Sequence, residues 1–404
     1  MRIRIVTTVS YPDGFAATSR IRCFAKALIA AGDEVEVISP RNIKIFPGSK
    51  IYFHGIHDGV NYKILNNFYQ GQNRWIKYLL AYLEPLVLFI YVTVSCGCAD
   101  VYLIYSSNNV LSYFSMIILK LFGKKIIIEV NEYPYETPGS RISRIPIANK
   151  ILKIFYWRGV FPLANGILVI SKALEDVAVK YAPKAKILRI PILTEYKSLL
   201  SENNAIKSDQ VYLVHAGTLS EQKDGIFVVF QAFVKAHKML FKEYGIRLKF
   251  YLTNRVAQTT ILKKIESILH DNNLSEEVIM MGYCEEKKLN DLLCGALVMV
   301  INKPDHLQNL YNFPTKLGLY LASHRPVIFA GHGMEVNQYL INEDNAIVVT
   351  PNDIDQISAQ IVRCYSDPEF SRKIGNNGAE TVKQHFYYSN HSVVLSKFMQ
   401  SLLS

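Results

Sequence analysis

This chain of 404 residues has few cysteines, and it lacks the features of an export signal. Its N-terminus, MRIRIVTTVS, reads as a strand and contains neither the apolar core nor the cleavage site of a secretory signal. The six cysteines are scattered, and Cys96 and Cys98 form a CxC pair with no second pair nearby to complete a metal site. We therefore expect buried thiols in a reduced, cytoplasmic protein.

Motifs for nucleic-acid, metal and cofactor binding are missing as well. The sequence has no arginine-rich arm, zinc-ligand spacing or RNA-binding aromatic motif, so we expect no nucleic-acid partner. His54 and His57 have HxxH spacing but no acidic third ligand close by. Gly14 stands alone rather than in a GxGxxG fingerprint, which argues against a dinucleotide cofactor. We expect neither a cofactor nor a bound metal.

Only one stretch, Leu79–Cys98, approaches the length of a membrane span. Glu84 and Pro85 interrupt it, and no comparable second stretch exists, so we interpret it as a helix inside or on the surface of a soluble domain. Its flank at residues 74–78, RWIKY, mixes cations with aromatic rings as interfacial helices do. Peripheral attachment to the inner face of a membrane therefore stays open.

Charge and size narrow the class of protein further. The chain has 45 Lys and Arg against 34 Asp and Glu, a formal net charge of +11. This excess favours anionic partners such as phosphorylated ligands or an anionic membrane surface. Hydrophobic residues make up 50% of a chain that is too long for one ordinary core, so we expect two domains, each with its own core.

Strand and helix patterns alternate through both halves of the chain. We predict a first Rossmann-like domain at residues 1–193, a linker at 194–210 with little periodicity, and a second Rossmann-like domain at 211–384. A final helical segment at 385–404 could pack back on the first domain. The predicted fold class is α/β, with two doubly wound domains that face each other across a cleft.

A helix start in the second domain is the strongest candidate for an anion site. In the stretch NLYNFPTKLGLYLASHRPV, we place Pro314 at the first helical position, with Asn312 or Phe313 as the cap and the end of the helix near Ser323. Its first amides and Lys316 would then face an anion. The alternative is an ordinary proline-started helix with a surface lysine.

Four motifs together resemble a known family: SYPDGFAATSR near the N-terminus, IIIEVNEYP, HAGTLSEQKDG and NFPTKLGLYLASHRPVI. The chain resembles the retaining nucleotide-sugar glycosyltransferases of family four, which have the two-domain GT-B fold. Among them it looks like a bacterial polysaccharide or lipid-linked-glycan transferase. The resemblance implies a nucleotide-sugar donor and a glycan or polyprenyl-linked acceptor.

The resemblance also implies roles for single residues. Lys223 stands where a lysine of the family contacts the donor diphosphate, and Glu132 would bind the acceptor or the sugar, or act as a base, unless it is a structural carboxylate. The implied diphosphate site comprises Gly14, Gly217, Lys223, Phe313, Pro314, Thr315 and Lys316. Asn131 joins Glu132 at the catalytic end of its strand, and Tyr311, Asn312 and Leu319 lie toward the sugar or nucleoside. His215 could touch the nucleotide or be a structural histidine.

Two expected carboxylates are missing. Family members commonly have a Glu-x7-Glu pattern near the sugar and the ribose, and Tyr311 and Leu319 occupy these two places here. Thr218 stands where many relatives have an arginine. From the four motifs taken together, we predict a retaining glycosyltransferase of cell-surface polysaccharide synthesis, such as capsule or O-antigen. The alternatives are a catalytically silent transferase-like subunit of an assembly complex and a nucleotide-sugar epimerase on the same fold.

Overall fold

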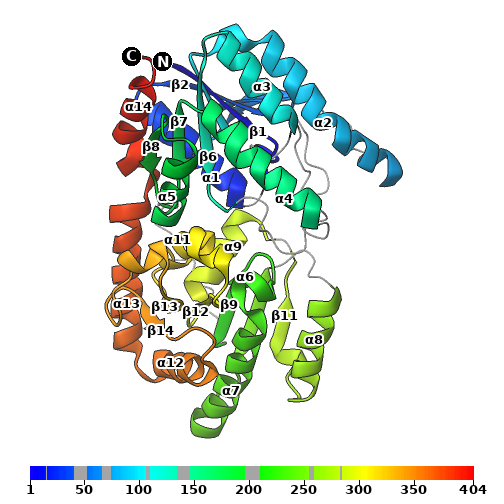
Figure 1. Ribbon diagram of the computed structural model, residues 1–404. Helices are drawn as coiled ribbons and strands as arrows, with labels where there is room; N and C mark the ends of the chain where they lie inside the picture. The colour runs from blue at the N-terminus through cyan, green and yellow to red at the C-terminus, as the bar shows by residue number, and fades with distance from the viewer. Residues whose placement is uncertain are drawn as a thin grey trace. The chain divides into compact units, whose positions relative to one another are not determined.

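The computed structural model divides into two compact units (Figure 1). Unit 1 comprises Met1–Glu195 and Tyr387–Ser404, and unit 2 comprises Tyr196–Phe386. Most of the linker predicted at 194–210 lies outside the described residues. The structure describes residues 1–14, 16–40, 52–65, 74–105, 110–133, 146–195, 210–253, 259–282 and 284–404.

Unit 1 is built on an eight-stranded sheet with the order β3-β4-β2-β1-β5-β6-β7-β8. All pairs in it are parallel except β3 with β4. The strand order runs away from β1 in both directions, which places a topological switch point between β1 and β5. The strands are β1 (Arg2–Thr7), β2 (Glu34–Ser39), β3 (His54–His57), β4 (Val60–Ile64), β5 (Val101–Tyr105), β6 (Lys125–Val130), β7 (Gly166–Val169) and β8 (Lys186–Arg189).

The helices of unit 1 include α1 (Ala16–Ala30), α2 (Arg74–Val94), α3 (Val110–Leu121), α4 (Pro146–Phe155), α5 (Lys172–Tyr181) and α14 (Ser392–Gln400). Short helical turns follow α2 at Cys96–Cys98 and α4 at Tyr156–Val160 and Phe161–Leu163. Ser171 is the N-cap of α5, and its side chain accepts a hydrogen bond from the amide of Leu174.

Helix α14 joins the core of unit 1 although it lies at the other end of the chain. Leu395 and Met399 of α14 are buried in the same cluster as Phe24 and Leu28 of α1. Just before α14, the amide of Tyr388 donates to the carbonyl of Thr194 at 3.1 Å. The two places where the chain passes between the units are therefore hydrogen-bonded to each other within unit 1.

The long apolar stretch is helical through its proline. α2 contains Pro85 in its interior and begins at Arg74, five residues before the stretch that we singled out in the sequence. Within the part of the chain that the structure describes, no helix is both long enough and apolar enough to cross a membrane.

Unit 2 has two three-stranded parallel sheets that are joined along one edge. Their orders are β11-β10-β9 and β12-β13-β14, and a parallel bridge between Leu213 and Val298 places β9 beside β12. This arrangement puts a second topological switch point between β9 and β12. The strands are β9 (Tyr212–Ala216), β10 (Lys249–Thr253), β11 (Val278–Met280), β12 (Met299–Asn302), β13 (Val327–Ala330) and β14 (Ile347–Val349).

Helices cover these strands and fill the core of unit 2. Helix α7 buries Phe230 and Phe233 against Phe250 of β10, with ring centroids 5.2 and 5.4 Å apart. Gly225 and Gly245 bound this helix, both in the left-handed region that glycine adopts at little cost. The helices are α6 (Glu221–Asp224), α7 (Ile226–Tyr244), α8 (Thr259–His270), α9 (Glu286–Gly295), α10 (Leu307–Tyr311), α11 (Thr315–Leu321), α12 (Ile354–Ser366) and α13 (Pro368–Thr381).

Candidate functional site

Two lysines share one carboxylate at the switch point of unit 2. Lys303 directly follows β12, and its ammonium lies 2.8 Å from Oδ1 of Asp224. Lys316, the second residue of α11, places its ammonium 3.0 Å from Oδ2 of the same side chain. Ligands of open α/β sheets bind at this end of the strands. The three residues therefore form a charged cluster where a ligand is expected.

Backbone geometry fixes the position of Asp224. It ends the short helix α6. The N-cap of this helix is Ser220, whose hydroxyl accepts from the amide of Lys223 at 3.1 Å. Gly225 follows with φ +48°, and a Cβ atom there would lie 2.2 Å from Nδ2 of Asn302. Lys303 also donates to the carbonyl of Lys223 at 2.9 Å. Lys303 therefore binds both the backbone of α6, at Lys223, and the carboxylate of Asp224.

The cluster carries a surplus positive charge. Burial alone would raise the pKa of Asp224, but Lys316 and Lys303 outweigh it and hold this pKa below its usual value. Burial lowers the pKa of Lys316, which Asp224 opposes. The side chain of Lys303 is 7% exposed, whereas that of Lys316 is 22% exposed. Lys316 is thus the cation that can reach a ligand, and Lys303 is the one that stays with Asp224.

His215 lies at the end of β9 and is neutral. Its Nε2 is 3.0 Å from the ammonium of Lys316 and 3.5 Å from the carbonyl of Thr218. The ammonium can only donate, so the shorter contact places the ring proton on Nδ1. Burial, and then the charge of Lys316, lowers the pKa of His215 to about 3. The ring therefore acts as a hydrogen-bond acceptor for Lys316.

This buried ring predicts a loss of stability in mild acid. The pKa of His215 falls from its ordinary 6.5 to about 3 on folding, so between these values the unfolded chain binds a proton that the folded chain does not. Above pH 6.5 this group does not change the free energy of unfolding. Below pH 6.5 it lowers the free energy of unfolding as the pH falls. We expect a loss of at most about 2 kcal/mol between pH 6.5 and pH 5, measured by urea unfolding.

The variant His215→Gln should flatten this pH dependence, because glutamine does not titrate. His270→Gln is the matched control, since the His270 side chain is 88% exposed. Equal slopes for wild type and His215→Gln between pH 6.5 and pH 5 would show that His215 is not the group responsible. Asp224, whose pKa is also lowered, acts in the same direction but at lower pH.

The helix start predicted at Pro314 is shifted by one residue. Pro314 is the N-cap of α11, with ψ at 101°, and Thr315 is the first helical residue, so the prediction for Pro314 was wrong. The helix ends at Leu321 rather than near Ser323, and Asn312 caps the end of α10 instead. Proline fixes φ but not ψ, and here ψ is extended.

The structure brings three of the predicted donor-site residues together. Gly217 follows β9 with φ +90°, and a Cβ atom there would lie 3.6 Å from Cε of Lys316. His215 contacts Lys316 on the other side. The side chain of Lys223 is half-buried, and its carbonyl meets Lys303.

The other predicted residues of unit 2 lie in α11 or just before it. Thr315 is exposed, whereas Pro314 is buried and Phe313 packs against Tyr339 and Phe386, with ring centroids 5.9 and 5.6 Å apart. Asn312 is buried, and Tyr311 and Leu319 are half-buried.

Gly14, Asn131 and Glu132 belong to unit 1. The side-chain Nδ2 of Asn131 donates to the hydroxyl of Tyr105 at 2.8 Å, at the carboxyl ends of β6 and β5. Glu132 is the next residue, and its side chain is half-buried. A Cβ atom on Gly14 would lie 1.9 Å from Oγ1 of Thr18, so a larger residue does not fit without movement. These residues lie at the ligand-binding end of the sheet of unit 1.

Glu129 is part of the framework of unit 1. Its Oε1 accepts from Nε of Arg20 at 2.7 Å, and both side chains are almost fully buried. Arg20 also donates to the carbonyl of Pro191 at 2.9 Å. Arg20 thereby joins α1 to β6 and to the chain beyond β8, so Glu129 has a structural role.

Sequence reasoning missed Lys303, Asp224 and Tyr320. The hydroxyl of Tyr320 accepts from the amide of Ala216 at 2.7 Å, which ties α11 to β9. Lys303 had a signal in the sequence, because it directly follows the apolar run of β12, whose end faces the ligand side. Asp224 stood inside a motif that we quoted, but only the fold shows that it faces two lysines.

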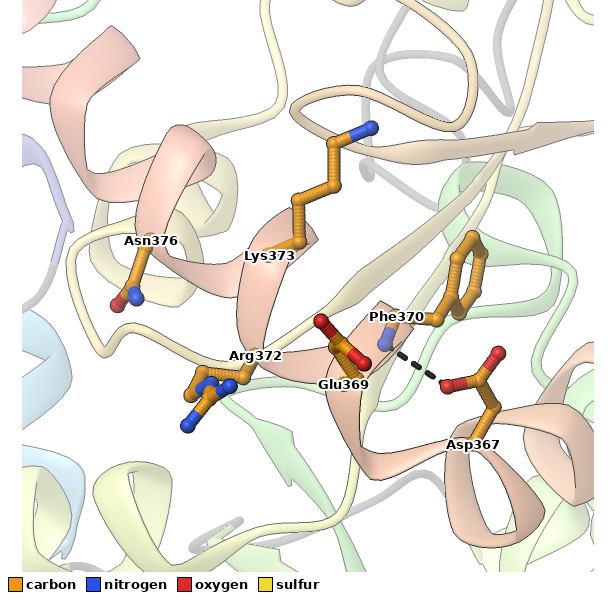
Figure 2. A pocket seen from close by; sticks show the side chains of 6 residues that line it. All are labelled: Asp367, Glu369, Phe370, Arg372, Lys373 and Asn376. Atoms are coloured by element: carbon orange, nitrogen blue, oxygen red, sulfur yellow. Dashed lines mark hydrogen bonds between the residues drawn. The ribbon is translucent and has the colours of Figure 1, made fainter.

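A cavity of about 410 Å³ lies elsewhere in unit 2, along α13 (Figure 2). The carboxylate of Asp367 caps this helix by accepting from the amide of Phe370 at 2.9 Å. The cavity mixes both signs of charge and contains no residue of the cluster, so we do not assign the donor to it. Its lining is Asp367, Glu369, Phe370, Arg372, Lys373 and Asn376. Among the described residues, no group of three or more His, Cys, Asp and Glu could hold a metal ion.

Comparison with known proteins places this site in a recognised domain. Residues 210–367 match the family model described as Glycosyl transferases group 1, and this range includes the whole cluster. No curated protein sequence matches the chain significantly.

Solved structures match over nearly the whole length. Sucrose-phosphate synthase (tll1590) from Thermosynechococcus elongatus has a TM-score of 0.68 at 16% identity, covering 100% of this chain and 99% of that one. Anabaena Alr3699/HepE in complex with UDP-glucose has a TM-score of 0.70 at 11% identity, covering 99% of each chain. The lipopolysaccharide outer core galactosyltransferase WaaB has a TM-score of 0.58 at 11% identity, covering 98% of this chain and 99% of that one.

At such identities the structural likeness shows the fold, which is the GT-B fold that the sequence predicted. The match to the family model assigns residues 210–367 to the Glycosyl transferases group 1 domain. Residues 210–367 are therefore a glycosyltransferase domain, in a chain that has the GT-B fold.

Proposed function

We propose that the enzyme moves a sugar from a nucleotide-sugar donor to a polyprenyl-linked glycan acceptor, with retention of anomeric configuration. Such a reaction would extend a cell-surface polysaccharide, of the capsule or O-antigen kind, at the inner face of the membrane. The observation that carries this proposal is the cluster of Lys303, Asp224 and Lys316 at the switch point of unit 2.

The cluster suits a departing nucleoside diphosphate. Negative charge grows on the leaving diphosphate as the bond to the sugar breaks, and fixed cations that meet this charge lower the barrier. Lys316 can turn from Asp224 toward a phosphate, because Lys303 continues to neutralise the carboxylate at 2.8 Å. Lys223, Gly217 and the first amides of α11 would complete the diphosphate site.

The sugar and the nucleoside would bind close to this cluster. Tyr311, Asn312 and Leu319 would border them, without the two carboxylates common in the family. A leucine at the ribose position leaves the ribose hydroxyls without that acceptor, which typically costs about 1 to 3 kcal/mol. The neighbour that is described in complex with UDP-glucose makes UDP-sugars the first donors to test.

Unit 1 would supply the acceptor site. We propose that Glu132 and Asn131 bind the acceptor hydroxyl or the sugar, and that Gly14 lines the same acceptor site of unit 1. Their place at the carboxyl ends of the strands of unit 1 supports this role. The proposal includes no metal and no cofactor.

A donor panel tests the proposed reaction. UDP-, GDP- and dTDP-sugars are incubated with polyprenyl-diphosphate-linked glycans, and NMR determines the anomeric configuration of the new linkage. We expect one donor to react, with its configuration retained. Inversion would disprove the retaining mechanism, and conversion of the donor without acceptor would identify an epimerase instead.

A second candidate function follows from Tyr311 and Leu319, which replace the family carboxylates. In that case the chain would be a silent transferase-like subunit of a polysaccharide assembly complex. It predicts no turnover with any donor, and no change in nucleotide affinity when Lys223 is replaced by alanine. Turnover with a single donor would exclude it.

A further inference from the structure

One ammonium group serves two acceptors at the switch point of unit 2. Nζ of Lys316 lies 3.0 Å from Oδ2 of Asp224 and 3.0 Å from Nε2 of His215. Both of these residues are buried, and Asp224 has a second donor in Lys303, at 2.8 Å from its Oδ1. Among the described residues, Nε2 of His215 has no other donor. The ring nitrogen therefore depends on Lys316 alone.

The surroundings of the ring cannot replace this lysine. The carbonyl of Thr218 lies 3.5 Å from Nε2, and a carbonyl accepts hydrogen bonds but does not donate them. Nδ1 is buried and has no hydrogen-bond partner within the part of the chain that the structure describes. Without Lys316, the neutral ring would turn a buried lone pair toward a carbonyl oxygen, which is unfavourable. A proton on Nε2 would convert the same contact into a hydrogen bond to Thr218.

Lys316 has to leave His215 in order to meet a diphosphate. Burial lowers the pKa of Lys316, so its ammonium is withdrawn from water. Its side chain is nevertheless 22% exposed, and Gly217 places no side chain beside its Cε. Asp224 keeps its pair with Lys303 when Lys316 turns. The group that loses its partner is therefore Nε2 of His215.

We propose that His215 is a positioning residue that holds Lys316 beside Asp224, and that it exchanges this lysine for a proton when a nucleotide sugar draws the ammonium away. The proton comes from solvent and binds Nε2, which then donates to the carbonyl of Thr218 or to Oδ2 of Asp224. It returns to solvent when the nucleotide leaves and Lys316 moves back. The inference rests on the proposed function, since the anion that binds Lys316 is the diphosphate of the donor.

The charges that face the ring give the direction of the effect. Burial, Lys316 and Lys303 lower the pKa of His215, whereas Asp224 and the carbonyl of Thr218 raise it. A diphosphate that draws Lys316 away removes one of these cations and brings negative charge, so the pKa of His215 rises from about 3 toward its ordinary 6.5. The complex then binds more protons than the free enzyme, and affinity for the donor increases as the pH falls.

Two further elements meet this end of β9 without adding charge. Leu252 of β10 is the strand partner of His215. Tyr320 of α11 accepts from the amide of Ala216 at 2.7 Å, and burial raises the pKa of its hydroxyl, which stays neutral. The exchange therefore involves the ring, the two lysines and Asp224.

Calorimetry in two buffers counts the protons. UDP-, GDP- and dTDP-glucose are titrated into the full-length protein at pH 6 and at pH 8, each time in two buffers whose heats of ionisation differ. The diphosphate of these donors does not titrate in this range, so any uptake belongs to the protein. With the donor that binds, we expect uptake of about 0.5 to 1 proton at pH 6, almost none at pH 8, and at least about threefold higher affinity at pH 6.

The variant His215→Gln separates the ring from other groups that titrate. Its side-chain carbonyl can accept from Lys316, but it cannot take up a proton. We expect the variant to bind the donor without proton uptake and with equal affinity at pH 6 and pH 8. His270→Gln is the matched control, because the His270 side chain is 88% exposed, and it should keep the uptake of wild type.

Thermal melting confirms that both variants are folded. A wild-type measurement makes the test independent of them: carbon-13 NMR of the ring carbons of the ten histidines shows whether a ring gains a proton when the donor binds at pH 6. We expect one ring to do so.

Two outcomes would overturn this inference alone. Donor binding without proton uptake at pH 6 would show that Lys316 reaches the phosphate with its third N–H while it stays on His215. Uptake that persists in His215→Gln would place the proton on another group. Absence of binding by all three donors is a different result, because it contradicts the proposed function and this inference falls with it.

Discussion

Replacing Lys316 with methionine should lower kcat/KM for the donor by about 10²- to 10³-fold. Lys316 is the more exposed of the two lysines of the cluster, and we place its ammonium on the departing diphosphate. A cation that meets charge developing in the transition state affects the chemical step more than the binding of substrate. The loss should therefore appear mainly in kcat.

The fold should survive this change. Methionine keeps the length of the side chain, and Asp224 keeps Lys303 at 2.8 Å, so no buried carboxylate is left unpaired. The change Lys303→Met is more damaging to stability, because Lys303 holds both Asp224 and the carbonyl of Lys223.

Lys235→Met provides the control for Lys316→Met. Lys235 forms an exposed ion pair with Asp355 on unit 2, and its loss should not change kcat/KM. If Lys316→Met retains wild-type kcat while Lys223→Met loses it, the diphosphate contact belongs to Lys223, as the family resemblance implies, and our assignment of the leaving-group cation is wrong.

Replacing Glu129 with alanine should destabilise the enzyme by about 3 to 5 kcal/mol. Its carboxylate is 1% exposed and pairs with Arg20, which is 4% exposed. Removing the carboxylate leaves a guanidinium buried without a counter-charge, and desolvation of that charge is not recovered. Urea unfolding measures the loss.

An exposed ion pair of similar chemistry is the control for this prediction. Glu343 accepts from Arg363 on the surface of unit 2, and Glu343→Ala should cost no more than about 1 kcal/mol. The double change Arg20→Met and Glu129→Leu should recover part of the loss, because it removes both buried charges. A cost below about 1 kcal/mol for Glu129→Ala would show that Arg20 finds water or another partner.

The sequence predicted the class of fold because buried parallel strands have a strong signal. Apolar runs such as those of β1, β5 and β6 are followed by helical periodicity, and they specify doubly wound domains. The local cap at Ser171 was also predictable, since a cap depends on residues close in sequence.

The charged cluster was not predictable, because it depends on contacts between distant residues. Asp224 and Lys303 are separated by 79 positions and Asp224 and Lys316 by 92, and only the pairing of β9 with β12 brings these segments together. The shift at Pro314 has a local cause, since proline fixes φ and leaves ψ open. The assignment of Lys223 to the diphosphate stays a prediction.

Calorimetric titration with nucleotides tests the central claim most directly. We claim that a nucleoside diphosphate binds beside Lys316, so one of UDP, GDP and dTDP should bind wild type saturably. It should bind more tightly than its monophosphate, and Lys316→Met should remove most of that difference. Absence of binding by all three diphosphates, or equal affinity for the diphosphate and the monophosphate, would contradict the account.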